Sequence, residues 1–308
     1  MAKQPLSHFS PVFANQPWAN DDGYLSYYRH QYRHRVERIP MGKRRWGRRR
    51  GLYSWKVETA LNRDLENNAA LVYAELLSFR ELQTDQRLTW AQFLLSQVVR
   101  TPTFMRYELA ARRMCNLHET SAHDRVGCKE CGDLVCITAR DWCLLLSHPD
   151  DFFVRSDNPV LLTGFIERPE TCLFYPLSSQ ICFVACSMPS DCEPLTSSRD
   201  QPPAFYGLEL EKGGAHFINF HLARAAQDLL ILSPSLDGSV AAAMFTEVLG
   251  LYPQPPFLLH SPAHEEMHAA FESIRSLMSI EDGFDYPSWL PFELEPFPET
   301  RPKHAGAV

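Results

Sequence analysis

Residues 151–162, with the sequence DFFVRSDNPVLL, consist of two apolar stretches separated by a polar turn. Phe152–Val154 and Val160–Leu162 are short apolar runs of the kind found in buried strands. The residues between them have turn chemistry, because Asp and Asn side chains bind their own backbone and Pro159 fixes φ. We therefore predict a strand interrupted by a turn. Its Ser156–Asp157 pair has two interpretations, a simple turn or a polar site at the mouth of a buried strand.

Helical patterns surround this central stretch. In residues 54–80 apolar side chains recur every three or four positions, and Pro102 ends or kinks a second helical pattern. We expect helices at 54–80, 86–102, 103–115, 216–232, 239–252 and 264–280, and strands at 152–154, 160–162, 172–186 and 204–210. Because these elements follow one another in blocks without βαβ alternation, we predict an α+β fold, mostly helical, with a small, largely antiparallel sheet in the middle of the chain.

The order of these patterns divides the chain into three parts. We expect an irregular N-terminal arm with a basic segment at 1–53 and a main α+β domain at 54–250 that carries a Cys/His-rich insertion at 115–136. A C-terminal helix and a Pro-rich tail follow at 251–308. With 308 residues, the chain is long enough to bury a sizeable core.

Several classes of protein are excluded by composition and motif. The sequence has no run of 18 apolar residues, which excludes a transmembrane helix, and no apolar signal core near residue 1. Nine cysteines without a signal favour reduced thiols and a cytoplasmic protein. A phosphate-binding glycine loop and a G-x-S-x-G elbow are both missing from the sequence.

Charge is concentrated in one basic segment. Residues 29–50 carry a local charge of +9, although the whole chain has a net charge of −7. Tyr32 and Trp46 lie among these charges, a combination that suits base stacking and phosphate neutralisation on a nucleic acid. The alternative is an exposed basic loop without a partner. The candidate nucleic-acid-binding residues are Lys43, Arg44, Arg45, Arg48, Arg49 and Arg50.

A second cluster has the spacing of metal ligands. Cys128-x-x-Cys131 places two thiolates within reach of one Zn²⁺ ion. The second pair of ligands is either Cys115-x-x-His118 or His123 with Cys136. With four protein ligands such a zinc site is closed and therefore structural. The alternative is a set of small buried cysteines.

Two glutamates on the first predicted helix form a further candidate site. Glu58 and Glu66 are eight residues apart on this helix, so we expect them to share a face, within about 12 Å of each other. Together with Asp157 they have the oxygen ligands that Mg²⁺ prefers. The alternative is a solvated helix face.

Five short motifs occur in the order typical of a known family. They are HFSPVF (His8–Phe13), RTPTF (Arg100–Phe104), FVRSDNPV (Phe153–Val160), PLS (Pro176–Ser178) and Asn219. In this order the chain resembles the domain-of-unknown-function family 4238, over roughly residues 8–235. It departs from the usual pattern in lacking an Arg after Pro11 and in its heavier basic run. The resemblance implies a setting in bacteria and phages, where some members accompany anti-phage defence genes.

The polar residues of these motifs are the candidate catalytic set: Asp157, Ser156, Arg100, Ser178, His8 and Asn219. In a phosphodiesterase or glycosidase His8 or Asp157 would act as the base, and Arg100 would hold the anion. The alternative is a buried polar network, in which Asp157 binds Arg100 and His8 ties the arm to the main domain.

The sequence therefore supports two functional hypotheses. The first is an anti-phage defence effector, a hydrolase of nuclease type that acts on RNA or DNA. The second is a non-catalytic sensor or interaction protein that binds nucleic acid or protein and contains a structural zinc site.

Overall fold

The computed structural model describes residues 6–31, 35–50, 52, 55–102, 104, 132–163, 166, 169, 171–186, 205–226 and 229–232. The helices predicted at 239–252 and 264–280 lie outside these residues, and so does nearly all of the helix predicted at 103–115. The same holds for the C-terminal tail and for the proposed zinc ligands Cys115, His118, Cys128 and Cys131.

A five-stranded mixed sheet forms the centre of the fold. Its strands are β5 (Trp142–Leu146), β7 (Leu161–Leu162), β8 (Leu173–Pro176), β9 (Ile181–Ala185) and β10 (Phe205–Glu209). They are arranged in the order β10-β5-β9-β8-β7. The edge strand β10 runs parallel to β5, and the other neighbours are antiparallel.

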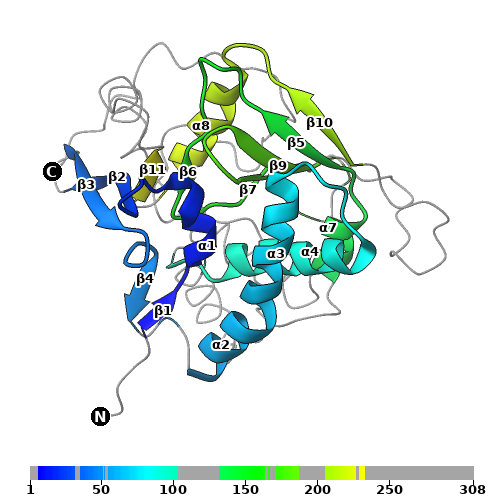
Figure 1. Cartoon of the computed structure of the whole chain (residues 1–308), viewed down its shortest axis with the longest axis horizontal. Coiled ribbons are helices and arrows are strands. Elements are labelled where there is room, and N and C mark those ends of the chain that lie inside the picture. The colour runs from blue at the N-terminus through cyan, green and yellow to red at the C-terminus, as the bar shows by residue number, and fades with distance from the viewer. Residues whose placement is uncertain are drawn as a thin grey trace, which may run out of the picture.

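Alternation along β5 separates two hydrophobic cores. Trp142 and Leu144 belong to the core that also contains the helices before the sheet, whereas Cys143 and Leu145 belong to the core on the other face. Successive side chains of a strand point to opposite faces, so one apolar run serves both cores. Figure 1 shows the sheet between α3 and α4 on one side and α8 (Gly214–Ala225) on the other.

The helices on the first face form one long element followed by α4. The long element consists of α2 (Trp55–Ala60), the π-helical turn η3 (Leu61–Glu66) and α3 (Asn67–Leu77). Next, α4 (Thr84–Val99) begins at a capping box between Gln83 and Gln86 and ends at Arg100, just before Pro102. The short helix α7 (Gly132–Thr138) packs against α4. The helices predicted at 54–80 and 86–102 are therefore confirmed.

The first fifty residues form strands and short helices around the second core. In chain order, these elements are β1 (Leu6–His8), α1 (Val12–Asn15), the 3-10 turn η1 (Gln16–Trp18), β2 (Tyr24–Gln31), β3 (Arg35–Gly42) and β4 (Arg48–Arg50). β1 and β4 pair as a two-stranded ribbon. A four-stranded sheet in the order β3-β2-β11-β6 adds β6 (Arg155–Ser156) and β11 (Leu229–Leu232).

Four predictions about the fold are wrong, and the fourth, the strand at 152–154, is described in the next paragraph. The α+β class is correct, but a mostly helical chain with one small sheet is not, because the described residues form five-, four- and two-stranded sheets. Residues 1–53 were expected to be irregular, yet they contain β1–β4. The helix predicted at 216–232 ends at Ala225, where the backbone becomes extended, and the apolar residues 229–232 form β11 against β2 and β6.

The strand expected at 152–154 is replaced by side-chain contacts. Asn219 accepts a hydrogen bond from the Val154 N–H (2.9 Å) and donates to the Phe152 carbonyl (2.6 Å). A buried amide thus takes the place of a neighbouring strand, and ladder pairing begins at Arg155. As regards membranes, none of the helices in the described part of the chain combines the length and the apolarity needed to cross a bilayer.

Candidate functional site

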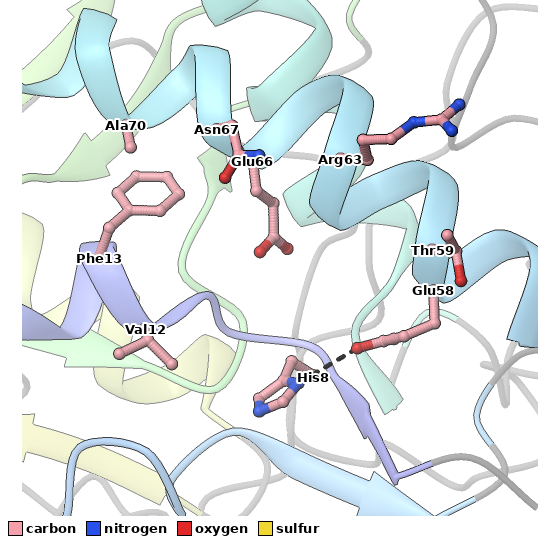
Figure 2. Close-up of a pocket in the computed structure, with 9 residues that line it drawn as sticks. All are labelled: His8, Val12, Phe13, Glu58, Thr59, Arg63, Glu66, Asn67 and Ala70. Atoms are coloured by element: carbon pink, nitrogen blue, oxygen red, sulfur yellow. Dashed lines mark hydrogen bonds and ion pairs between the residues drawn. The ribbon is translucent and has the colours of Figure 1, made fainter.

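An open cavity lies between the long helical element and the segment that follows β1. Its volume is about 620 Å³. Its lining side chains come from β1, α1, α2, η3 and α3 (Figure 2): His8, Val12, Phe13, Glu58, Thr59, Arg63, Glu66, Asn67 and Ala70. The cavity therefore brings together three residues named from the sequence, His8, Glu58 and Glu66.

His8 and Glu58 form a hydrogen-bonded pair at one end of this cavity. The Nδ1 atom of His8 lies 3.1 Å from Oε1 of Glu58, and the side chains are 22% and 10% exposed. Figure 2 shows the Glu58 side chain reaching from α2 to the imidazole. A carboxylate in this position fixes the tautomer and orientation of the ring, as is required of a histidine that acts as a general base.

Glu66 is the second acidic residue of the cavity, and it forms an ion pair with Arg100. Nη1 of the fully buried Arg100 lies 2.6 Å from Glu66 Oε1. The same guanidinium donates from Nε to the Phe9 carbonyl at 3.0 Å. With its amide oxygen oriented toward the guanidinium, Gln97 accepts two further hydrogen bonds from Arg100, at 2.8 and 2.7 Å. Figure 2 shows the Glu66 carboxylate pointing into the space between α3 and the β1–α1 segment.

The π-helical turn explains why both glutamates reach the same cavity. In a regular α-helix eight residues correspond to a rotation of about 80° beyond two full turns, which would separate the two side chains. Residues 61–66 are π-helical, so each residue turns the chain by a smaller angle. The wider winding brings Glu66 back toward the face that carries Glu58. Such turns are frequent at functional sites.

The β1–β4 ribbon places basic residues beside His8. His8 is directly opposite Arg48 in the antiparallel register, and Ser7 is opposite Arg49. Opposed residues of antiparallel strands project from the same face, so the Arg48 and His8 side chains are neighbours. All three arginines of β4 are exposed. Gly47 allows this close approach, because it has a φ of +74° and a Cβ atom there would lie 2.5 Å from Ser10 Cβ.

The remaining basic candidates lie just before β4. Arg44 and Arg45 are exposed, and the Lys43 ammonium donates to the Gln16 side-chain oxygen. Trp46 is 1% exposed and packs against Phe9 at a centroid distance of 6.0 Å. The expected base-stacking role of Trp46 is therefore wrong, because its ring belongs to the core. Tyr32 lies outside the described residues.

Arg155, which the sequence analysis did not select, anchors the other end of the segment after β1. It is fully buried, and its Nη1 donates to the Ala14 carbonyl at 2.8 Å. Its Nη2 contacts the Tyr175 hydroxyl at 2.8 Å and Ser10 Oγ at 3.4 Å. Burial raises the pKa of Tyr175, and the positive charges of Arg155 and Arg100 act in the opposite direction. Two buried arginines thus fix the segment that carries His8 and Phe13.

Three of the candidate catalytic residues have local structural roles. Ser156 Oγ donates to the Asn158 carbonyl at 2.6 Å and accepts from the Asn158 N–H at 3.2 Å, as in a turn. Ser178 Oγ accepts from the backbone N–H groups of residues 180 and 181, at 3.2 and 3.1 Å, in the β8–β9 turn. Asn219 connects α8 to residues 152–154. Asp157 is buried beside Ser156, and its catalytic role stays a prediction.

Metal binding stays a prediction as well. The four proposed zinc ligands lie outside the described residues, and Cys136 lies on α7. Within the part of the chain that the structure describes, no group of three or more His, Cys, Asp or Glu side chains is arranged to hold a metal ion. Glu58 and Glu66 share the cavity, but the contacts they make there are with His8 and Arg100.

Comparison with known proteins agrees with the resemblance seen in the motifs. The model of a family described as a protein of unknown function, DUF4238, matches residues 7–130. The expected resemblance to this family is therefore confirmed over that part of the chain, which includes every residue that lines the cavity as well as β4 and Arg100. No curated protein and no solved structure matches the chain.

Proposed function

We propose that this protein is a hydrolase of nuclease type that cleaves phosphodiester bonds at the His8–Glu58 end of the cavity. One observation carries the proposal: the imidazole that Glu58 orients at 3.1 Å also lies directly across the β1–β4 ribbon from Arg48. An acid–base group and a phosphate-binding group thus stand side by side. This arrangement suits a reaction in which a nucleophile loses a proton next to an anionic phosphate.

In this proposal, different residues carry out proton transfer, phosphate binding and positioning of the base. His8 removes the proton of the attacking hydroxyl or water, and Glu58 stabilises the imidazolium that forms. Arg48, Arg49 and Arg50 bind the phosphates of the chain, because arginine matches phosphate geometry and all three side chains are exposed. Arg100 binds the carbonyl of Phe9, next to His8, and so keeps the base in place. It is a positioning residue.

The same proposal extends to the cellular setting. The family resemblance implies a bacterial or phage context, and in that context a nuclease would act as an anti-phage defence effector. The activity and the setting are separate parts of the proposal, and the experiment below tests the activity.

A second candidate function is a non-catalytic nucleic-acid-binding protein. It is favoured by the way Arg100 and Arg155 direct their guanidinium groups to the carbonyls of Phe9 and Ala14. Such contacts secure the segment after β1 whether or not His8 performs chemistry. In this alternative the exposed arginines of β4 bind phosphates, and the His8–Glu58 pair is only a structural contact.

Cleavage assays with the full chain separate the two candidates. Labelled single-stranded RNA, tRNA, single-stranded DNA and duplex DNA are incubated with the protein, with Mg²⁺ or with a chelator. We expect cleavage of at least one substrate, and we expect His8→Asn and Glu58→Gln to lower the rate by about two to four orders of magnitude.

The matched control is His148→Asn, which removes a partly exposed histidine near Asp150, away from the cavity. It should retain full activity. Binding without cleavage, unchanged by His8→Asn, would support the non-catalytic alternative.

A further inference from the structure

The cavity has a second end whose chemistry differs from that of the His8–Glu58 pair. Val12, Phe13 and Ala70 make this end apolar, and Asn67 adds an amide (Figure 2). The half-buried Phe13 ring is fixed edge-on against Tyr73 at a centroid distance of 5.4 Å and lies 5.3 Å from Phe93. A fixed aromatic ring at the wall of a pocket is a surface on which a nucleobase stacks.

Glu66 lies between the two ends, and its carboxylate has a fixed orientation. The ion pair with Arg100 holds it at 2.6 Å, and its side chain is 12% exposed, so it faces the cavity rather than bulk water. An ionised carboxylate only accepts hydrogen bonds, and its two oxygens have lone pairs beyond the one that Arg100 occupies. It therefore selects a ligand edge that presents donors.

Among the nucleobases, guanine fits such an acceptor best. Its N1–H and N2–H groups are adjacent donors, so they can meet a carboxylate as a bidentate pair. The corresponding edges of adenine, cytosine and uracil each set an acceptor beside the donor, and that acceptor would face the negative carboxylate. A base that stacks on Phe13 and binds Glu66 through this edge cannot be paired, so the substrate strand is single-stranded.

From this arrangement, and resting on the proposed function, we infer that the substrate is single-stranded RNA cleaved after guanosine, with the guanine on Phe13 and Glu66 and the 2′-hydroxyl at His8. RNA carries its own nucleophile next to the phosphorus atom, so a proton acceptor oriented by a carboxylate is sufficient to start the reaction. Phosphates on either side of the bond would lie along Arg48–Arg50.

The reaction balances with water as the only other reactant. His8 takes the 2′-hydroxyl proton, and the O2′–P bond forms while the P–O5′ bond breaks. The leaving O5′ takes a proton from a water molecule at the open side of the cavity, and His8 gives its proton to the hydroxide that remains. The products are a 2′,3′-cyclic phosphate and a 5′-hydroxyl end.

The test uses the full chain with three labelled oligonucleotides of one sequence that contains a single guanosine. The first is all RNA, the second has a 2′-deoxy sugar at the guanosine alone, and the third is DNA. We expect cleavage after the guanosine in the first, with a 2′,3′-cyclic phosphate end, and no cleavage at that position in the other two.

Variants test the base-binding end separately. Phe13→Leu keeps an apolar side chain but removes the stacking surface, so it should weaken cleavage after guanosine by about tenfold or more. Glu66→Gln should reduce the preference for guanosine over the other three nucleotides, measured as a ratio of rates on one mixed-sequence RNA. The control is Glu75→Gln, which breaks the ion pair between Glu75 of α3 and Arg80. It should change neither the rate of cleavage after guanosine nor the preference for guanosine.

Each negative result would overturn a different part of the two proposals. Cleavage of the DNA or of the 2′-deoxy oligonucleotide at an equal rate would overturn the RNA inference and leave the nuclease proposal standing. RNA cleavage at all four nucleotides alike, unaffected by Phe13→Leu, would overturn the assignment of the guanine pocket. If no substrate is cleaved at all, both proposals fall.

Discussion

Arg100 and Glu66 form an ion pair of 2.6 Å between a fully buried guanidinium and a carboxylate that opens onto the cavity. Because Arg100 also binds the Phe9 carbonyl at 3.0 Å, one side chain sets the position of both walls of the cavity. The α4 helix, which ends at Arg100, thereby links the core to the site.

Loss of this guanidinium should be costly for folding. Arg100→Met leaves Glu66 and the Phe9 carbonyl without their shared partner, and breaking a buried pair typically lowers the free energy of unfolding by about 3–5 kcal/mol. Urea denaturation measures this loss. Arg80→Met, which removes an exposed ion pair with Glu75, is the control and should have little effect. Equal stability of the two variants would show that Arg100 does not hold the cavity walls together.

Asn219 should be important for stability rather than for activity. In Asn219→Ala the Val154 N–H and the Phe152 carbonyl both lose their partner, and each buried unpaired group costs roughly 1–3 kcal/mol. Asn219→Asp keeps an acceptor for the Val154 N–H but buries a carboxylate with one oxygen against the Phe152 carbonyl, so its free energy of unfolding should fall at least as far. A folded and fully stable Asn219→Ala protein without cleavage activity would instead support the catalytic role proposed from the sequence.

The arginines of β4 should bind nucleic acid without reading its sequence. Changing Arg48, Arg49 and Arg50 to Ala should weaken binding of all oligonucleotides alike. The slope of log affinity against log salt should decrease by roughly 0.7 for each phosphate of a single strand that the variant no longer neutralises. Fluorescence anisotropy at several salt concentrations measures both. Arg80→Ala gives the reference for removal of an exposed arginine outside the ribbon. If the triple variant has the same slope of log affinity against log salt as the parent protein, β4 is not part of the nucleic-acid interface.

The buried thiols around β5 and β8 should make stability depend on alkaline pH. Burial raises the pKa of Cys143 to about 12 and that of Cys172 to about 11, from an ordinary value of 9.0. Above pH 9 the unfolded chain loses these protons and the folded protein keeps them, so the unfolded state binds fewer protons and stability falls. The contribution is fully present below pH 9 and is lost as the pH rises toward 11 to 12.

Unfolding free energies at several pH values between 7 and 10.5 test this dependence. Cys172→Ala should show a shallower fall above pH 9 than the parent protein, since it lacks one of the buried thiols whose pKa is raised. Alkylation of the folded protein at pH 8 should also modify Cys143 and Cys172 more slowly than a free thiol does, because the reactive form is the thiolate. Rapid alkylation of both would contradict their burial.

Local patterns predicted part of the fold correctly. The helical spacing in 54–80 and 86–102 is a property of neighbouring residues, so it could be recognised without knowledge of the rest of the fold. The apolar run at 172–186 was also recognised as strand, although the structure divides it by a turn into β8 and β9. The strands of the first fifty residues were missed, because their many charged side chains hide the alternation and their partners lie far along the chain.

The site was predicted in fragments. His8 and Arg100 were chosen from motifs, and Glu58 and Glu66 from their spacing, but the sequence has no signal that joins residue 8 to residue 58. Arg155 was overlooked because it stands at the edge of a turn, where a charged residue is unremarkable. The spacing of Glu58 and Glu66 led to the expectation that they share a helix face, but the π-helical winding of residues 61–66, which brings both side chains to the cavity, had no signal in the sequence.

The contacts that fix the segment after β1 span long stretches of chain: His8 reaches Glu58, Phe9 reaches Arg100, and Ala14 reaches Arg155. During synthesis the ribosome therefore releases the proposed base long before the last of its supports. A nascent chain that stops short of Arg155 lacks the partner of the Ala14 carbonyl, which is the last of these three contacts to be made. On the proposed function, incomplete copies would therefore carry a base whose supporting segment is not fully fixed, and full support would come only to chains translated past that arginine.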